Sequence, residues 1–239
     1  MLDILRSLFI SFFAVAVLLP VIRYAMRRLS PARPGTPLTA EELKYMQKRD
    51  WRLMWAYCFF ATILAIFSAG TLAIVSSIIH SDTSGYIYML TPNFGALFAP
   101  GLLLGLTLAV LPLKLVQQTL LGHDHDMYKE YLQQSEGNRS IKIYRILFLV
   151  MLLLSGVVAW FAVQWHVTID AGQVKVTNPF SEERTYAMSD INEIRYLGKE
   201  GEYLVTFNDQ TSINTAYLKP VDLEMIALLS EKSGHRLIQ

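Results

Sequence analysis

Residues 53–79 read LMWAYCFFATILAIFSAGTLAIVSSII, without a single charged side chain. A hydrocarbon core about 30 Å thick is crossed by about 20 apolar residues in a helix, so this stretch predicts a transmembrane helix. Residues 94–113 and 146–165 form two further apolar stretches. Residues 7–22 form the shortest one, which arginines at both ends can extend to the interfaces. The sequence therefore predicts four transmembrane helices.

Composition supports the same class of protein. Of the 239 residues, 53% are hydrophobic and 17% charged, with a mean hydropathy of +0.33, against about 25% charged residues in a soluble domain. The net charge of +1 does not suggest a nucleic-acid partner. Cys58 is the single cysteine, so an intrachain disulfide is excluded.

The first apolar stretch could also be read as a signal peptide. The residues after Pro20 offer no small-x-small cleavage site before a neutral mature end. We therefore expect a retained helix, and a membrane domain of residues 1–165 followed by a C-terminal domain of residues 166–239.

Lysine and arginine crowd into two of the connecting segments. Residues 23–52 contain eight of them and residues 114–145 contain five, whereas residues 80–93 contain none. Because short cytoplasmic loops carry the excess of Lys and Arg, we expect both basic segments in the cytoplasm. The two termini and residues 80–93 then lie outside.

The basic residues near the first connection suit an anionic lipid surface. Those expected to contact the membrane surface are Arg23, Arg27, Arg28, Lys44, Lys48, Arg49 and Arg52. The alternative is that these charges serve only to set the topology.

Residues 39–42, Thr-Ala-Glu-Glu, predict the start of a helix. In a capping box the Thr39 hydroxyl accepts a backbone N–H one turn into the helix, and Glu42 reaches back to the Thr39 amide. We expect a helix from Ala40 that runs directly into the second span. Three prolines and a glycine in residues 31–37 exclude a continuous helix before it.

The run His123, Asp124, His125, Asp126 raises the possibility of a metal site. A metal usually needs a third or fourth ligand, and Glu130 and Glu136 have no compelling spacing. Acidic residues near a helix start are also explained by the helix dipole. No metal or other cofactor is therefore expected.

The third span contains Pro100, Gly101 and Gly105. Such residues can break a helix to bind a transported substrate, but more often they give a kink and close helix packing. The second, third and fourth spans contain no Asp, Glu, Lys or Arg. Since buried ionisable residues mark most ion-coupled transport sites, their absence disfavours a transporter.

From Val167 onward the hydrophobic period changes from helix to strand. Strands are predicted at residues 167–170, 174–177, 184–188, 191–197, 203–207 and 211–216. In the fourth of these, Ile191, Ile194 and Leu197 are expected to face inward. An amphipathic helix is expected from Pro220 onward, to cap an open antiparallel sheet or barrel.

This order of elements resembles the bacterial PH-like (pleckstrin-homology-like) modules that are attached to membrane helices. The resemblance rests on the opening hairpin at 167–177, the turn at 186–194, the hairpin at 208–210 and the closing helix near 221–233. It implies a small α+β domain that binds or assembles proteins. It also suggests a bacterial inner (plasma) membrane, although such modules usually face the cytoplasm.

The leading interpretation is a non-enzymatic, multi-pass membrane protein whose C-terminal domain binds a protein partner or assembles copies of itself. A subunit of a transporter or channel is the alternative. A membrane enzyme with a metal site at residues 123–126 is the weakest of the three readings.

The topology prediction can be tested directly. A reporter that is active only outside the cytoplasm, fused after Gln239, is expected to be active, because an even number of spans returns the chain to the side of its N-terminus. A fluorescent reporter that folds only in the cytoplasm, fused at the same point, should stay dark. A bright cytoplasmic reporter would contradict the span count or the orientation.

Overall fold

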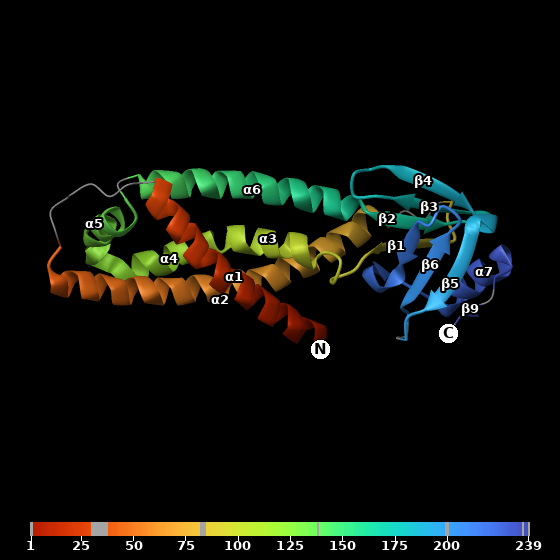
Figure 1. Ribbon diagram of the computed structural model, residues 1–239, viewed down its shortest axis with the longest axis horizontal. Helices are drawn as coiled ribbons and strands as arrows, with labels where there is room; N and C mark the ends of the chain where they lie inside the picture. The colour runs from red at the N-terminus through yellow and green to blue at the C-terminus, as the bar shows by residue number, and fades with distance from the viewer. Residues whose placement is uncertain are drawn as a thin grey trace. The chain divides into compact units, whose positions relative to one another are not determined.

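The computed structural model describes residues 2–29, 38–81, 85–137, 139–198, 201–235 and 237–238. The chain divides into two compact units. The helical unit comprises Met1–Ser68 and Pro100–Val157, and the sheet unit comprises Ala69–Ala99 and Val158–Gln239. The sheet unit thus includes residues 69–99 as well as the C-terminal part of the chain (Figure 1).

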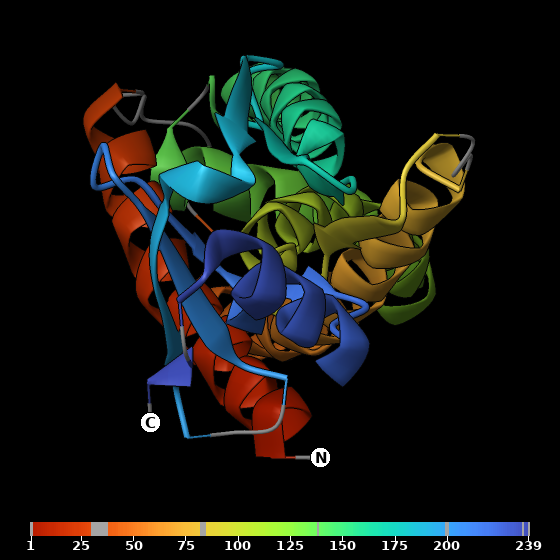
Figure 2. The same cartoon turned by 90° about the vertical axis from the view of Figure 1, so that its right-hand side faces the viewer.

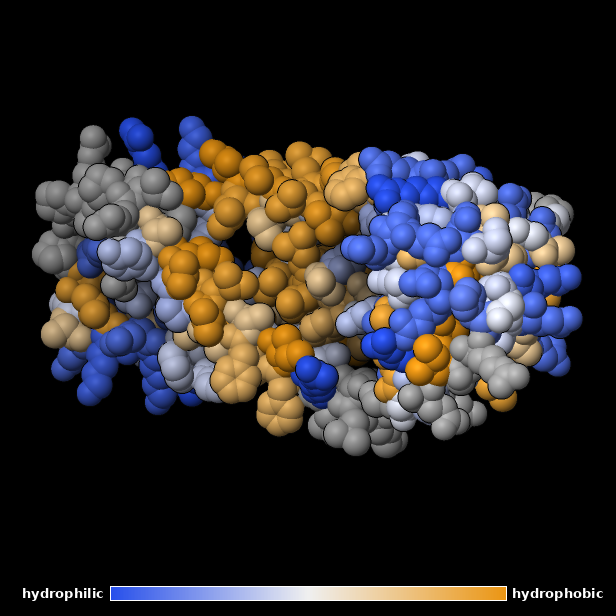
Figure 3. Space-filling view, turned by 45° about the vertical axis from the view of Figure 1, so that its right-hand side comes forward, coloured by the Kyte–Doolittle hydropathy of each residue, from blue (hydrophilic) through white to orange (hydrophobic). Residues whose placement is uncertain are grey.

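The N-terminal part of the chain is helical. Its helices are α1 (Leu2–Leu29), α2 (Ala40–Ile79), α3 (Phe98–Leu108), α4 (Val110–Leu121), α5 (His125–Glu136) and α6 (Ser140–Gln164). Within the described residues, three helical stretches are long and apolar enough to cross a membrane: Ala40–Ile79, Phe98–Glu136 and Ile141–Gln164. The apolar part of α1, Arg6–Ile22, is shorter than these three stretches, so the first of the four predicted spans is not among them. Hydrophobic side chains cover much of the surface of these helices (Figure 3).

The third predicted span differs from the observed helices at both ends. Residues 94–97 form a turn, and α3 begins only at Phe98. The helix is interrupted at Ala109 and resumes as α4. Pro112 explains the interruption, because it has no N–H to donate to the carbonyl of Leu108 four residues earlier.

Gly105 packs α3 tightly against α2. A Cβ atom at this position would lie 2.5 Å from the Ala65 Cα and 2.8 Å from the Leu64 carbonyl carbon. The Tyr57 hydroxyl donates to the Leu106 carbonyl at 2.9 Å beside this contact. Helix α3 is continuous through Pro100, Gly101 and Gly105, so none of them unwinds it, and Gly105 permits the close packing.

The capping box at the start of α2 is confirmed. The Thr39 amide donates to Glu42 Oε2 at 2.8 Å, and the Glu42 amide donates to Thr39 Oγ1 at 3.3 Å. The helix begins at Ala40 and continues for 40 residues without interruption. The proline-rich segment at 31–37 lies outside the described residues.

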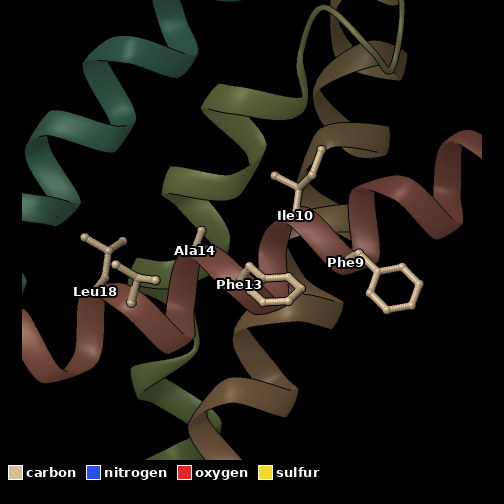
Figure 4. A pocket seen from close by; sticks show the side chains of 6 residues that line it. Phe9, Ile10, Phe13, Ala14 and Leu18 are labelled. Atoms are coloured by element: carbon tan, nitrogen blue, oxygen red, sulfur yellow. The ribbon is translucent and has the colours of Figure 1, made fainter.

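A shallow hollow runs along one apolar face of α1. The shallow hollow is lined by Phe9, Ile10, Phe13, Ala14, Val17 and Leu18, all from α1. Figure 4 shows Ile10, Ala14 and Leu18 along one line of the helix, with the rings of Phe9 and Phe13 beside it. The opposite face carries Ser11 and Val15, which are fully buried in the helical unit. A face without polar atoms is suited to lipid.

The sheet unit contains two antiparallel sheets and a helix. The strands are β1 (Tyr88–Pro92), β2 (His166–Ile169), β3 (Gln173–Thr177), β4 (Glu183–Ala187), β5 (Ile191–Tyr196), β6 (Tyr203–Phe207), β7 (Ser212–Asn214), β8 (Leu218–Lys219) and β9 (Leu237–Ile238). The first sheet has the order β4-β3-β2-β1-β8 and the second β7-β6-β5-β9, in which β9 alone runs parallel to its neighbour. Helix α7 (Leu223–Ser233) stands in front of the strands in Figure 2.

Strand β1 comes from the segment that the sequence predicted as a plain loop. It pairs with β2, with Tyr88 opposite Ile169 and Leu90 opposite Val167, and its other edge pairs with β8. Asn93 fixes the same segment, since its side-chain amide donates to the Ala216 carbonyl at 2.7 Å. The short run of aromatic and aliphatic residues at 86–90 was the available signal.

The core lies between the two sheets and α7. It includes Leu90, Ile169, Val174, Ile194 and Phe207, and α7 adds Met225, Ile226 and Leu229.

Two predicted details of this core are wrong. Leu197 is 39% exposed, because the register of β5 shifts between Ile191 and Glu193 and later residues exchange faces. Helix α7 starts at Leu223, after an Asp222 N-cap, and not at Pro220.

Gly105→Ala should weaken the helical unit, because the new methyl group would collide with the α2 backbone. Overpacking of this kind costs about 1–3 kcal/mol, and unfolding of the full chain by a denaturing detergent should report it. Gly156→Ala in α6 is the matched control, since a Cβ there meets no atom within 4 Å. Equal stability of the two variants would contradict the tight α2–α3 contact.

Candidate functional site

A concave surface of the sheet unit lies between β4 and β7, which are end strands of its two sheets. It has a volume of about 230 Å³ and is lined by Val176 of β3, Asn178, Arg184 and Tyr186 of β4, Phe207 of β6, and Thr211, Ser212 and Ile213 at β7. We call it the β4–β7 groove. In the described part of the chain, β4 and β7 each pair with one strand only, so each has a free edge at this groove.

The floor of the groove is apolar and rigid. Tyr186 stacks on Phe207 with ring centroids 4.0 Å apart and an interplanar angle of 15°. Phe207 and Ile213 are buried, and Val176 packs against the same core. An occupant would therefore find a preformed apolar surface.

A hydrogen-bonded network holds Tyr186 in place. Its hydroxyl donates to Asp209 Oδ2 at 3.1 Å and lies 2.8 Å from Thr211 Oγ1. The Thr211 hydroxyl and the Thr211 amide both donate to Asp209 Oδ1, at 2.5 Å and 2.9 Å. These hydrogen bonds from Thr211 hold the pKa of Asp209 below its usual value, so the carboxylate stays charged.

The groove combines free strand edges with an apolar floor. Free strand edges can hydrogen-bond an added extended chain, while pockets beside them accept its alternate side chains. Arg184 at the rim is exposed and positively charged. Among the residues that line the groove, Arg184 and Tyr186 are the ones with titratable side chains.

A second polar cluster lies where α2 ends. The rings of His80 and His166 are tilted against each other with centroids 4.3 Å apart. Nδ1 of His80 lies 2.9 Å from the Ser76 carbonyl, and Nδ1 of His166 lies 2.8 Å from the Gln164 carbonyl. Because each Nδ1 faces a carbonyl oxygen, the hydrogen bonds favour the Nδ1–H tautomer in both rings.

Hydroxyl groups extend this cluster. Ser76 donates to the Val163 carbonyl at 3.1 Å, and Ser77 and Thr91 share a hydrogen bond of 3.2 Å. Thr177 lies 3.3 Å from Nε2 of His166. The end of α2 is therefore fastened to α6, β1 and β2 by polar contacts within the sheet unit.

Burial lowers the pKa of His166 below its usual value of 6.5, and the adjacent His80 ring adds to that effect. The two rings are tilted by 34° and each Nδ1 is already directed at a backbone carbonyl oxygen. The arrangement favours a neutral, packed His166.

The residues predicted to contact the membrane surface differ in their exposure and contacts. Lys44, Lys48 and Arg52 are exposed on α2. Arg49 instead makes internal contacts, because it donates to the Leu120 carbonyl at 2.9 Å and to the Tyr45 hydroxyl at 2.7 Å. Its guanidinium thereby satisfies a carbonyl at the end of α4.

The remaining three predicted surface residues, Arg23, Arg27 and Arg28, belong to α1. The structure does not describe the side chains of these three residues.

The residues of the suggested metal site have other roles. Asp124 accepts a hydrogen bond of 2.9 Å from the Tyr45 hydroxyl, and Asp126 forms an ion pair of 2.9 Å with Lys129. His123 and His125 are exposed. In the part of the chain that the structure describes, no three His, Cys, Asp or Glu side chains come together as a metal site.

The sequence and the structure were compared with known proteins. No family model matches the chain, and neither a curated protein nor a solved structure matches it.

Acid should destabilise the sheet unit through His166. Because the folded pKa is lowered, the unfolded chain binds more protons as the pH falls below the usual histidine value, and stability is lost there. The midpoint of thermal unfolding of the full chain in detergent should therefore drop between about pH 7.5 and about pH 5.5.

His166→Gln should reduce this pH dependence, whereas His123→Gln, at an exposed position, should leave it unchanged. If His166→Gln kept the whole of the pH dependence, the assignment to His166 would be wrong.

Proposed function

We propose that this chain is a non-enzymatic, multi-pass membrane protein whose C-terminal, PH-like domain binds a protein segment in the β4–β7 groove. The single observation that carries the proposal is the groove itself, in which a rigid apolar floor lies between two free strand edges. Sheet edges of this kind accept an extended chain through main-chain hydrogen bonds. The segment belongs either to another protein or to a second copy of this chain.

The proposed domain architecture is PH-like. Two antiparallel sheets around one core, closed by a C-terminal helix, support this assignment. Strand β1 is an addition to the pattern, since it is inserted from the segment between α2 and α3.

The proposed topology has four spans in a bacterial inner membrane, with α1 as the first and both termini in the periplasm. The pairing of β1 with β2 supports part of it. Since β1 follows α2 and β2 follows α6, both helices must end on the same side if both cross the membrane, and the stretch from α3 to α5 must cross back. The basic residues on the opposite side of these helices favour the cytoplasm there.

A photocrosslinking amino acid placed in the groove tests the proposed binding. Ser212 of β7 is exposed and lines the groove, whereas Ser189 is an exposed serine in the short turn Met188–Asp190, outside the groove. Crosslinking in intact cells should give one discrete adduct from position 212 and none from position 189. Arg184→Glu should weaken that adduct, because it reverses the charge at the rim without disturbing a buried residue.

The mass of the adduct separates a second copy of the chain from a different protein. If position 212 gave no adduct and the purified full chain were monomeric in nanodiscs, a binding function for the groove would be excluded. Equal labelling from positions 212 and 189 would have the same meaning, because it would show no preference for the groove.

A further inference from the structure

The turn between β3 and β4, residues 178–182, presents an apolar side chain at its tip. Phe180 is 75% exposed, although the rest of the turn is polar apart from Pro179. The turn is closed by its own backbone hydrogen bonds, from the Asn178 amide to the Glu182 carbonyl at 2.9 Å and from the Ser181 amide to the Asn178 carbonyl at 2.8 Å. The Phe180 ring is therefore held on a defined backbone.

The strand register directs this turn toward the end of α6. Strand β2 begins two residues after α6 ends, and its first residue, His166, lies opposite Thr177 at the end of β3. Thr177 lies in turn opposite Glu183 at the start of β4. The residues that connect Thr177 to Glu183 must then project beyond His166, back along the direction from which α6 arrives.

A ring contact confirms this direction. The Phe180 ring lies 5.7 Å from the ring of Phe161, within the last turn of α6. The neighbouring Trp160 is 61% exposed on the same turn. Figure 1 shows the β3–β4 connection beside the end of α6.

The end of α6 has the composition of a membrane interface. Leu153, about two turns earlier, is 72% exposed in a stretch apolar enough to span the bilayer. Tryptophan is enriched where such a helix leaves the hydrocarbon. A side chain in contact with Phe161 is therefore level with the boundary between headgroups and acyl chains.

We propose that the β3–β4 turn inserts Phe180 into the lipid leaflet reached by the end of α6, as a second attachment of the sheet unit to the bilayer. The occupant of this surface is lipid, because the exposed ring continues the apolar surface of a membrane-crossing helix. The internal hydrogen bonds of the turn fit this role, since backbone groups that enter a lipid interface must be satisfied within the protein. The proposal holds for either orientation of the chain and does not depend on the β4–β7 groove.

An environment-sensitive fluorophore on a single cysteine tests the insertion. The full-length chain with Cys58→Ala removes the natural thiol, and Phe180→Cys then introduces the labelling site at an exposed position. Ser189→Cys is the matched control, because it lies past Ala187, at the opposite end of β4. Both proteins are reconstituted into vesicles of phosphatidylethanolamine and phosphatidylglycerol.

The label at position 180 should emit at shorter wavelength than the label at 189. A quencher carried near the lipid headgroup should reduce its emission several-fold more strongly, and aqueous iodide should reduce it less. If both labels responded alike to the two quenchers, the insertion would be disproved. A shielded label that lipid quenchers do not reach, but that crosslinks to position 180 of a second copy, would also overturn the proposal and indicate a protein contact instead.

Discussion

The backbone pairing of β1 with β2 joins two segments that leave two different apolar helices. One partner follows α2 and the other follows α6, so the sheet cannot close unless the ends of both helices are held near each other. The contacts of Ser77 with Thr91 and of Ser76 with Val163 do this with hydroxyl groups at the point where α2 ends. Placing β1 between β2 and β8 also removes two edges that the sheet would otherwise expose.

In the described part of the chain four end strands remain, β4 and β8 in the first sheet and β7 and β9 in the second. Strands β4 and β7 end the two sheets on the same side of the core, and the gap between them is floored by Tyr186 and Phe207. Free edges risk uncontrolled association, yet this gap is short and is flanked by Arg184 and by the Asp209–Thr211 network. The proposed binding of an extended chain would use these edges.

The turn at Phe180 and the groove share strand β4. Arg184 lies four residues beyond Phe180 and is the second residue of β4. An anchored turn would hold the nearby end of the groove close to the bilayer surface. A membrane-proximal segment of another membrane protein, or of a second copy, would then reach the groove most easily. The histidine pair lies at the same end of the sheet, since His166 pairs with Thr177 just before the turn.

By itself the sequence determined whatever depends on neighbouring residues. Uninterrupted apolar runs predicted the long helices, Thr39 and Glu42 predicted the start of α2, and alternation predicted β2, β3 and β6 within one residue. Tertiary structure alone decided the place of β1, whose five residues carry too weak a local pattern to identify a partner far along the chain. The same applies to the His80–His166 contact and to the β4–β7 groove, which bring together residues with no relation in sequence. Leu197 shows the limit within one strand: a bulge exchanges the faces of β5, and only the pairing with β6 fixes where that bulge lies.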